Sequence, residues 1–329
     1  MIAQTAVLPD CTAVALDLFI AQDIMPDNPL VSILINNYNY GNFLGDAIAS
    51  ALNQTYPHVE VVVVDDGSTD HSREVIAQYR DQYGDRLIPV LKENGGQASA
   101  FNAGFAASHG EIICILDADD LFLPQKAVEL VELFKRDRDL GWCFHPLRLV
   151  DANAQPLPET EEYQSSQVYD FRAHIQQHGK LPYDAPATSG LCFRRSLLDK
   201  ILPMPQAHKI SLGDHYLKFT ALALSKGMSL GHPLACQRVH GTNAYTLIRD
   251  NRPIKARILM LTAYWIRVNF PEFTKFTNNL LARSLSLYWR SGGVESEQQP
   301  IVQRYLDAVS LPEKLEIQLR AFFRYLLPT

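Results

Sequence analysis

Residues 31–70, with the sequence VSILINNYNYGNFLGDAIASALNQTYPHVEVVVVDDGSTD, decide the fold of this chain. The apolar run that ends at Ile35 predicts a strand, and apolar residues from Phe43 to Leu52 then recur at the spacing of an amphipathic helix. Residues 59–66 are too uniformly apolar for a half-exposed strand, so we expect a strand buried on both faces. The stretch therefore predicts a strand–helix–strand unit whose two strands both end in polar residues.

The same alternation continues to residue 120. Further strands are predicted over residues 86–93 and 111–116, and helical segments rich in cap-type or small residues precede them. Units of about 30 residues in this order indicate right-handed crossovers and a mostly parallel sheet, hence an α/β fold. Ligands of such sheets bind at the carboxyl ends of the strands. This chain places four polar clusters there: NNYN (36–39), DDGSTD (65–70), NGGQ (94–97) and DADD (117–120).

The rest of the chain is more irregular. It predicts a helix over residues 124–136, a strand within 141–150, an irregular segment over 151–187, a helix near residue 213 and a last strand before residue 240. From residue 251 onwards the pattern is helical. We therefore expect an N-terminal extension (1–29), an α/β domain (30–248, with halves 30–120 and 121–248) and a helical C-terminal region (249–329).

Composition narrows the class of protein. The 329 residues are 47% hydrophobic and 20% charged, which is ordinary for a chain with a sizeable core. The formal net charge of −6 argues against nucleic-acid binding. Five scattered cysteines without a CxxC pair favour reduced thiols in the cytoplasm over disulfides or zinc. The N-terminus has no basic n-region and no apolar run is long enough to span a bilayer, so we expect a cytoplasmic protein, at most peripheral on the inner face of the membrane.

The stretch GEIICILDADDLFLPQK (110–126) ends a predicted strand in Asp117, Asp119 and Asp120. Carboxylates this close repel and raise each other's pKa values, so their clustering calls for a cause. They could be solvated loop acids, or one could cap the following helix. They could also bind a divalent metal ion, because hard cations prefer carboxylate oxygens.

Three segments together resemble the family 2 glycosyltransferases of the GT-A fold. They are the segment that begins at Val31, the segment NGGQASAFNAGFAASHGEIICILDADD (94–120) and the segment GDHYLKF (213–219). The resemblance runs to about Asn243 and makes residues 30–120 the half that binds a nucleotide sugar and 121–248 the acceptor half. It implies that Tyr38 stacks on the base and that Asn36 meets the base edge. A half-buried aromatic residue in a loop would have the same sequence pattern.

Further donor contacts follow from the same resemblance. Asp65 and Asp66 would meet the base or ribose, although acids here could equally cap the next helix. Asn94 and Gly95 would lie near the donor. Asn102 would contact the donor or bond to the backbone, and Phe101 stands where the family often has an arginine.

The metal site implied by the resemblance centres on the DADD cluster. Asp117 would approach the ribose or the metal, and Asp119 would coordinate Mn²⁺ or Mg²⁺ that bridges the donor diphosphate. Asp120 would cap the next helix or orient the other acids. In QRVHGTN (237–243), His240 would complete the metal site and Arg238 would pair with phosphate, although both could be ordinary loop residues.

The catalytic base implied by the resemblance is Asp214, which matches the second acid of an ED pair; Gly213 replaces the first. A carboxylate that deprotonates the acceptor hydroxyl suits a single-displacement, inverting transfer. Alternatively, Asp214 is an acid favoured by the dipole at a helix N-terminus. His215 is a weaker candidate base.

Residues 249–290 hold eight basic residues against two acidic ones, interleaved with apolar runs. This pattern suits a surface that contacts anionic lipid. It also suits helices that pack on the core or on a second subunit, which we prefer.

The function expected is that of a metal-dependent, inverting hexosyl- or N-acetylhexosaminyltransferase. It would use a nucleotide diphosphate donor, preferably UDP-linked, and act on a glycan or lipid-linked acceptor in polysaccharide biosynthesis for the cell envelope. One alternative is a GT-A-like module that binds nucleotide or glycan without turnover. Another is a sugar nucleotidyltransferase, but NNYNYGNF is not the Gly-rich basic loop expected of that class.

Overall fold

The structure is a computed structural model that describes residues 25–158, 164–205, 213–241, 243 and 251–327. Of the predicted N-terminal extension, residues 1–24 lie outside these ranges. The expected boundary between residues 248 and 249 lies outside them too.

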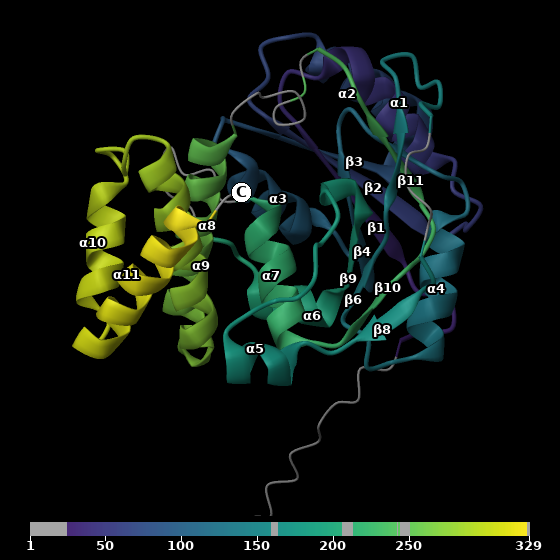
Figure 1. The fold of residues 1–329 in the computed structure, drawn as a ribbon. Coiled ribbons are helices and arrows are strands. Elements are labelled where there is room, and N and C mark those ends of the chain that lie inside the picture. The colour runs from purple at the N-terminus through teal and green to yellow at the C-terminus, as the bar shows by residue number, and fades with distance from the viewer. Residues whose placement is uncertain (1–24, 159–163, 206–212, 242, 244–250, 328–329) are drawn as a thin grey trace, which may run out of the picture.

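A sheet of eight strands forms the centre of the molecule, in the order β3-β2-β1-β4-β9-β6-β10-β8 (Figure 1). The strands are β1 (Val31–Asn37), β2 (Val59–Asp66), β3 (Leu87–Lys92), β4 (Ile112–Asp117), β6 (Trp142–Phe144), β8 (Gln167–Tyr169), β9 (Leu191–Arg194) and β10 (Gly227–Ser229). β1 pairs in parallel with β2 and β4, and β2 with β3. Only β9 and β8 run against their neighbours. The predicted α/β fold with a mostly parallel sheet is confirmed.

Helices cover both faces of this sheet (Figure 1). Helices α1 (Gly41–Leu52), α2 (Ser72–Tyr83) and α4 (Lys126–Arg136) lie on one face, and α3 (Gln97–Ala107), α6 (Arg195–Ile201) and α7 (Asp214–Leu224) on the other. β2 shows why both layers are needed, because its successive side chains point to opposite faces. Val61 and Val63 join the core beneath α1, whereas Val62 and Val64 join the core with Phe101.

A small second sheet joins β5 (Leu121–Phe122), β11 (Ala235–Arg238) and β7 (Leu147–Val150) in the order β5-β11-β7. The strand predicted within residues 141–150 is therefore two strands, β6 and β7, in different sheets. Pro146 lies between them, and proline lacks the N–H that a continuous ladder would need. The small sheet carries the residues after β11 to the acidic loop that follows β4.

The C-terminal region consists of the helices α8 (Arg252–Asn269), α9 (Thr274–Arg290), α10 (Gln299–Asp307) and α11 (Leu311–Leu326). They lie beside α7 and α5 (Arg172–His178), and Asn269 donates a 2.8 Å hydrogen bond to the Tyr216 hydroxyl of α7. Several of the basic side chains here have partners within the chain. Arg257 pairs with Glu295 at 2.7 Å, and Arg290 donates to carbonyls near the end of α11.

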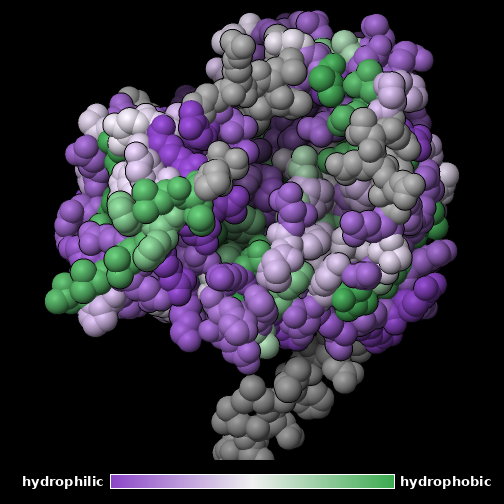
Figure 2. All heavy atoms as spheres, viewed as in Figure 1, coloured by the Kyte–Doolittle hydropathy of each residue, from purple (hydrophilic) through white to green (hydrophobic). Residues whose placement is uncertain are grey.

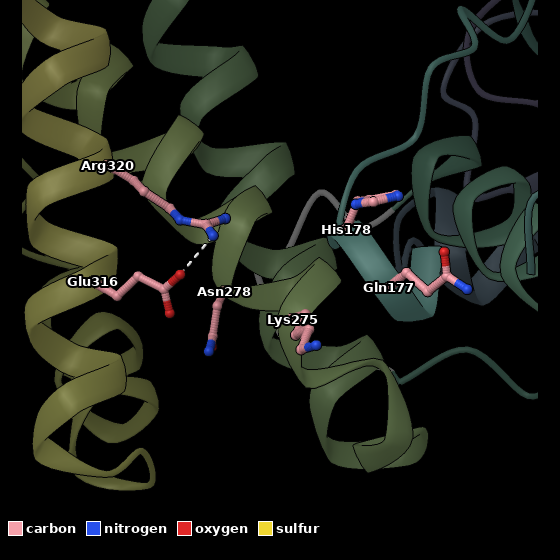
Figure 3. A pocket seen from close by; sticks show the side chains of 6 residues that line it. All are labelled: Gln177, His178, Lys275, Asn278, Glu316 and Arg320. Carbon is pink, nitrogen blue, oxygen red and sulfur yellow. Dashed lines mark hydrogen bonds and ion pairs between the residues drawn. The ribbon is translucent and has the colours of Figure 1, made fainter. Parts of the chain in front are cut away.

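Within the described ranges, none of the helices combines the length and the apolar character that crossing a membrane requires. A polar cavity of about 240 Å³ lies between α5, α9 and α11 (Figure 3). It is lined by Gln177, His178, Lys275, Asn278, Glu316 and Arg320. None of the residues predicted to bind the donor lines it.

Candidate active site

The carboxyl ends of β1, β2 and β4 bring the predicted donor residues together. In the sheet, Asn36 lies opposite Asp117 and Asn37 lies opposite Asp65. Asn37 donates a 3.0 Å hydrogen bond to Asp65. Both amide atoms of Asn36, by contrast, are buried and have no hydrogen-bond partner among the described residues. Buried polar atoms are costly to leave unpaired, so Asn36 is suited to bind a ligand.

Tyr38 is held outward by the loop after β1, and 48% of its surface is exposed. The next residue, Asn39, has a positive φ of 61° and accepts a 2.8 Å hydrogen bond from the Thr69 N–H. The Asn39 N–H also donates a 2.9 Å hydrogen bond to the Ser68 hydroxyl oxygen. These bonds tie the loop after β1 to the loop after β2 and leave the Tyr38 ring available for stacking.

Asp65 is completely buried and satisfied within the protein. Its carboxylate accepts hydrogen bonds from Asn37, the Ser68 N–H and the Arg73 guanidinium. Burial alone would raise the pKa of Asp65, but the bonds from Ser68, Arg73 and Asn37 outweigh it and lower the pKa. The side chain thus fixes the loop after β2.

Asp66 joins the NGG segment to β2. Its carboxylate accepts hydrogen bonds from the Gly95 and Gly96 N–H groups at 3.0 and 2.8 Å, and from Lys92. The approach is close, because a Cβ on the neighbouring Gly67 (φ +80°) would lie 2.6 Å from the Asn94 nitrogen. Asn94 and Gly95 are themselves exposed beside this contact.

Asn102 bonds to the backbone, one of the two alternatives that the sequence left open. Its amide donates to the Met204 carbonyl at 2.8 Å and accepts from the Met204 N–H at 2.7 Å. The neighbouring Phe101 is only 1% exposed and belongs to the core. Both residues therefore fix α3 against the chain around residue 204.

The acids after β4 have different surroundings. Asp120 accepts hydrogen bonds from the Ser189 hydroxyl at 2.6 Å and from the Arg238 N–H at 2.9 Å. It therefore anchors the acidic loop to other segments and does not cap α4. Burial, and then the charge of Asp119, raise the pKa of Asp120 to about 7. Burial and the charges of Asp120 and Asp119 likewise raise the pKa of Asp117 well above its usual value.

Asp119 contacts His240, which follows the end of β11. The His240 Nε2 lies 3.1 Å from Asp119 Oδ2, and Asn243 Nδ2 lies 3.3 Å from the same oxygen. The His240 ring stacks on Phe43 at 4.4 Å between centroids, which fixes its plane. The structure thus brings together the two residues predicted to bind metal, although they are 121 positions apart.

These residues fit a divalent ion as a partial ligand set. Carboxylate oxygen and imidazole nitrogen are both metal ligands, and neighbouring ligands about 2.1 Å from an octahedral ion lie about 3 Å apart. The raised pKa values of Asp117 and Asp120 also favour a neighbouring cation, because a positive charge would stabilise both carboxylates. Among the described residues, no group of three or more acidic, histidine or cysteine side chains is arranged to enclose an ion. The remaining ligands would be donor oxygens and water, as is usual for Mg²⁺-bound phosphates.

Arg238 is buried beneath the acidic loop. Its guanidinium donates to the backbone carbonyls of Asp119 and Ala152 at 2.9 and 2.7 Å, and to Asp46 at 2.8 Å. Only 3% of its side chain is exposed. The side chain therefore holds the acidic loop, the turn after β7 and α1 together.

Asp214 begins α7, as predicted, and both carboxylate oxygens have cationic or imidazole partners. Lys218 Nζ lies 2.9 Å from Oδ2, and His215 Nδ1 lies 3.0 Å from Oδ1. Burial opposes ionisation, but the Lys218 charge and the His215 hydrogen bond lower the pKa of Asp214 well below its usual value. The Asp214 charge also raises the pKa of Asp117, so the two acids are within electrostatic reach.

Three supporting residues had no role assigned from the sequence. Asn243 contacts Asp119, Ser189 links Asp120 with the Asp117 N–H, and Lys218 pairs with Asp214. Asn243 and Lys218 lie in segments already singled out, and Lys218 follows Asp214 by one helical turn. Ser189 carries no comparable signal, because its partners are about 70 positions away.

Comparison with known proteins gives a consistent result. A sequence profile described as Glycosyl transferase family 2 matches residues 32–202. An uncharacterised glycosyltransferase of Nostoc sp. (strain PCC 7120) is 35% identical over 270 residues, which are 79% of this chain and 83% of that protein. A putative teichuronic acid biosynthesis glycosyltransferase, TuaG of Bacillus subtilis, is 32% identical over 143 residues, 43% of this chain and 56% of that protein.

Among solved structures, S. aureus TarS 1–349 in complex with UDP-GlcNAc superposes with a TM-score of 0.61. The alignment covers 90% of this chain and 89% of that one at 17% identity, so it shows a shared fold. The arrangement of strands and helices is accordingly that of the GT-A fold. Taken with the profile and the Nostoc relative, it shows that this chain is a glycosyltransferase that belongs to family 2.

Proposed function

We propose that this glycosyltransferase is metal-dependent and inverting, and that it transfers a hexosyl or N-acetylhexosaminyl group from a nucleotide diphosphate donor. The observation that carries the proposal is the contact between Asp119 and His240. In addition, the charge of Asp214 acts on Asp117, which lies two positions before Asp119. A UDP-linked donor is favoured, and the UDP-GlcNAc bound to TarS supports that preference.

In this proposal the nucleotide binds at the ends of β1 and β2. The base stacks on Tyr38, and the unpaired amide of Asn36 bonds to its edge. Asp65 and Asp66 hold the two loops that frame the base, and they contribute to base or ribose binding through these loops. Asn94 and Gly95 lie along the donor, while Asn102 and Arg238 hold the surrounding backbone in place.

A divalent ion, Mn²⁺ or Mg²⁺, would be held by Asp119 and His240, with Asp117 facing the ribose or the ion. When bound, it would neutralise the charge that develops on the leaving diphosphate. Asn243 orients Asp119 through the same oxygen that His240 approaches. Asp120 fixes the loop through Ser189 and the Arg238 N–H, so that Asp119 is presented to the donor.

The proposed base is Asp214. Lys218 and His215 keep it ionised, so at neutral pH it can accept the proton of the acceptor hydroxyl as that oxygen attacks the anomeric carbon. Because attack comes from the face opposite the leaving group, one displacement inverts the anomeric configuration. His215 would orient Asp214 and is not needed as a base.

The acceptor proposed is a growing glycan or a lipid-linked saccharide of a cell-envelope polysaccharide. The TuaG relative, whose description places it in teichuronic acid biosynthesis, supports this class. We propose that the protein acts in the cytoplasm or on the inner face of the membrane, where such acceptors would be extended.

Calorimetry with UDP, GDP, dTDP and CDP, each with and without Mn²⁺, tests the donor site. We expect one nucleotide to bind only with metal, and Asp119→Asn to weaken it at least about tenfold because a charged ligand is lost. Asp139→Asn, which changes an exposed acid (83%) in the turn after α4, is the matched control and should bind normally. No binding under any condition would contradict the donor-site assignment.

Turnover separates catalysis from simple binding. Metal-dependent donor hydrolysis or transfer should fall at least about 100-fold in Asp214→Asn while nucleotide affinity stays unchanged. Equal turnover by the two proteins would contradict Asp214 as the base, whereas nucleotide binding without any turnover would support the alternative of a non-catalytic module.

A further inference from the structure

One long face of α11 is apolar and exposed. Six side chains of this face have between 48% and 71% of their surface exposed: Leu311, Leu315, Leu319, Phe322, Phe323 and Leu326. Figure 2 shows them as a hydrophobic band along the left of the molecule, where Figure 1 places α11. The opposite face of α11 carries the buried Ile317 and Ala321 and packs on α9.

The band reaches the upper limit of the apolar patches on typical monomers, and it exceeds that limit once the exposed end of α11 is included. Side chains of this kind present roughly 150–200 Å² each when fully exposed, so the measured fractions amount to about 600 Å². Exposed Tyr325 and Leu327 at the end of the helix raise this to about 800 Å². The largest patch on a typical monomer is about 300–600 Å², whereas each partner of a stable interface buries about 800 Å².

The spacing of the band is that of a helix that packs against another helix. Leu315, Leu319, Phe322 and Leu326 follow one another at intervals of four, three and four residues. Apolar residues at alternating intervals of three and four form the seam of a two-helix coiled coil. The partner that fits this band is therefore a helix.

The charges beside the band favour a protein partner over lipid. Arg320 pairs with Glu316 at 2.5 Å, as Figure 3 shows, and Arg324 donates to Asn279 at 3.0 Å. Lys314 lies 3.9 Å from Asp307. Helices that bind anionic lipid instead carry an excess of Lys and Arg on the polar face.

The order of these charges also fits one particular pairing. The first half of α11 holds Glu313 and Glu316 against Lys314, a net charge of −1, whereas Arg320 and Arg324 give the second half a net charge of +2. Two copies of α11 in antiparallel orientation would set the acidic half of each beside the basic half of the other. The same orientation opposes the two helix dipoles, which a parallel pair would not do.

We propose that the chain forms a homodimer in which α11 of one copy packs antiparallel on α11 of the other. Such an interface is isologous, so the same patch serves both copies and closes the assembly. Leu319 and Phe322 lie near the middle of the band and hence near the twofold axis. The inference is independent of the donor and acceptor proposed above.

Sedimentation equilibrium of the full chain at micromolar concentrations tests the dimer. We expect a dimer, and we expect the double variant Leu319→Glu/Phe322→Glu to weaken it by about 100-fold or more, because two charges would enter the centre of the seam. Val268→Glu, which adds a charge at an exposed (53%) position of α8, should leave the dimer intact. A monomeric wild type, or a dimer that the double variant leaves unchanged, overturns the proposal. Wild-type monomer that pellets with phosphatidylglycerol vesicles overturns it in favour of lipid.

A disulfide test checks the orientation without adding charge. In a Cys11→Ser background, Leu319→Cys should form a disulfide-linked dimer on mild oxidation, because the two copies of residue 319 would face each other near the axis. The other four cysteines are buried, so they should not compete. Val268→Cys should stay uncrosslinked. A residue near the axis can crosslink to its own copy in either orientation, so Leu311→Cys at the start of α11 decides between them. It should stay uncrosslinked in the antiparallel dimer, and a Leu311→Cys crosslink would rule that pairing out.

Discussion

The substitution Lys218→Met tests whether Asp214 is kept ionised by its neighbours. The Lys218 side chain is 7% exposed and its ammonium lies 2.9 Å from Asp214, so Lys218→Met leaves a part-buried carboxylate without its cation. We expect a loss of about 2–3 kcal/mol in unfolding free energy at neutral pH. Because burial then dominates, the pKa of Asp214 should rise, and the acid limb of kcat/KM should move to higher pH.

The sign of the pH effect on stability follows from the lowered pKa of Asp214. A carboxylate whose pKa is lower in the folded state stabilises the fold above its unfolded pKa of about 4 and loses that contribution as the pH falls further. The deficit of Lys218→Met should therefore be largest near neutral pH and shrink on acidification, as urea unfolding at several pH values would show. Lys218→Arg should restore the pH profile, and Lys200→Met on exposed α6 surface should change neither quantity. An unmoved acid limb would argue against Asp214 as the base.

At the scale of elements, the end of β11 supports the acidic loop through Arg238. If its role is to hold that loop, Arg238→Met removes the donor that now bonds to the carbonyls of Asp119 and Ala152 and to the Asp46 carboxylate. We expect a loss of about 2–4 kcal/mol in urea unfolding, together with weaker nucleotide binding through a displaced Asp119. A direct phosphate contact, as the sequence suggested, predicts weaker binding with normal stability. Asp46→Asn, at a partner with 60% exposure, should cost about 0.5 kcal/mol or less.

The sequence predicts the elements that carry the donor site, because each is a local pattern. Uniformly apolar runs identify β1, β2 and β4, and the polar residues after them must then meet at one edge of the sheet. The position of Asp214 at the start of α7 was predicted by family resemblance together with cap chemistry. These features need no knowledge of long-range contacts.

Long-range pairing is what the sequence does not determine. Nothing in LCFR predicts that β9 enters the large sheet between β4 and β6 and runs against both. The contact of Arg238 with Ala152, and that of Asn102 with Met204, join segments more than 80 positions apart. A buried arginine that bonds to carbonyls and one that binds phosphate have the same sequence signature, so only the folded contacts distinguish them.

At the scale of the whole molecule, the C-terminal helices share one hydrophobic core with the sheet. A single cluster of buried residues extends from Val62 of β2 through Tyr216 of α7 to Leu281 of α9 and Ile317 of α11. Because no separate core divides the helical region from the α/β region in the described ranges, we propose that the two unfold together. The division of the chain at residue 249 would then mark a change of architecture and not an independent folding unit.

Phe276→Ala tests this shared core. Phe276 of α9 is 2% exposed and its ring lies 6.1 Å from that of Phe219 on α7, so the substitution should cost about 3–5 kcal/mol. If the core is shared, hydrogen exchange read by mass spectrometry should show β2 and α9 peptides losing protection in parallel. Val268→Ala, at an exposed position of the neighbouring α8, should leave both protected. Loss of protection confined to α8–α11, with β2 unchanged, would show that the helices fold as a separate unit that docks on the catalytic region.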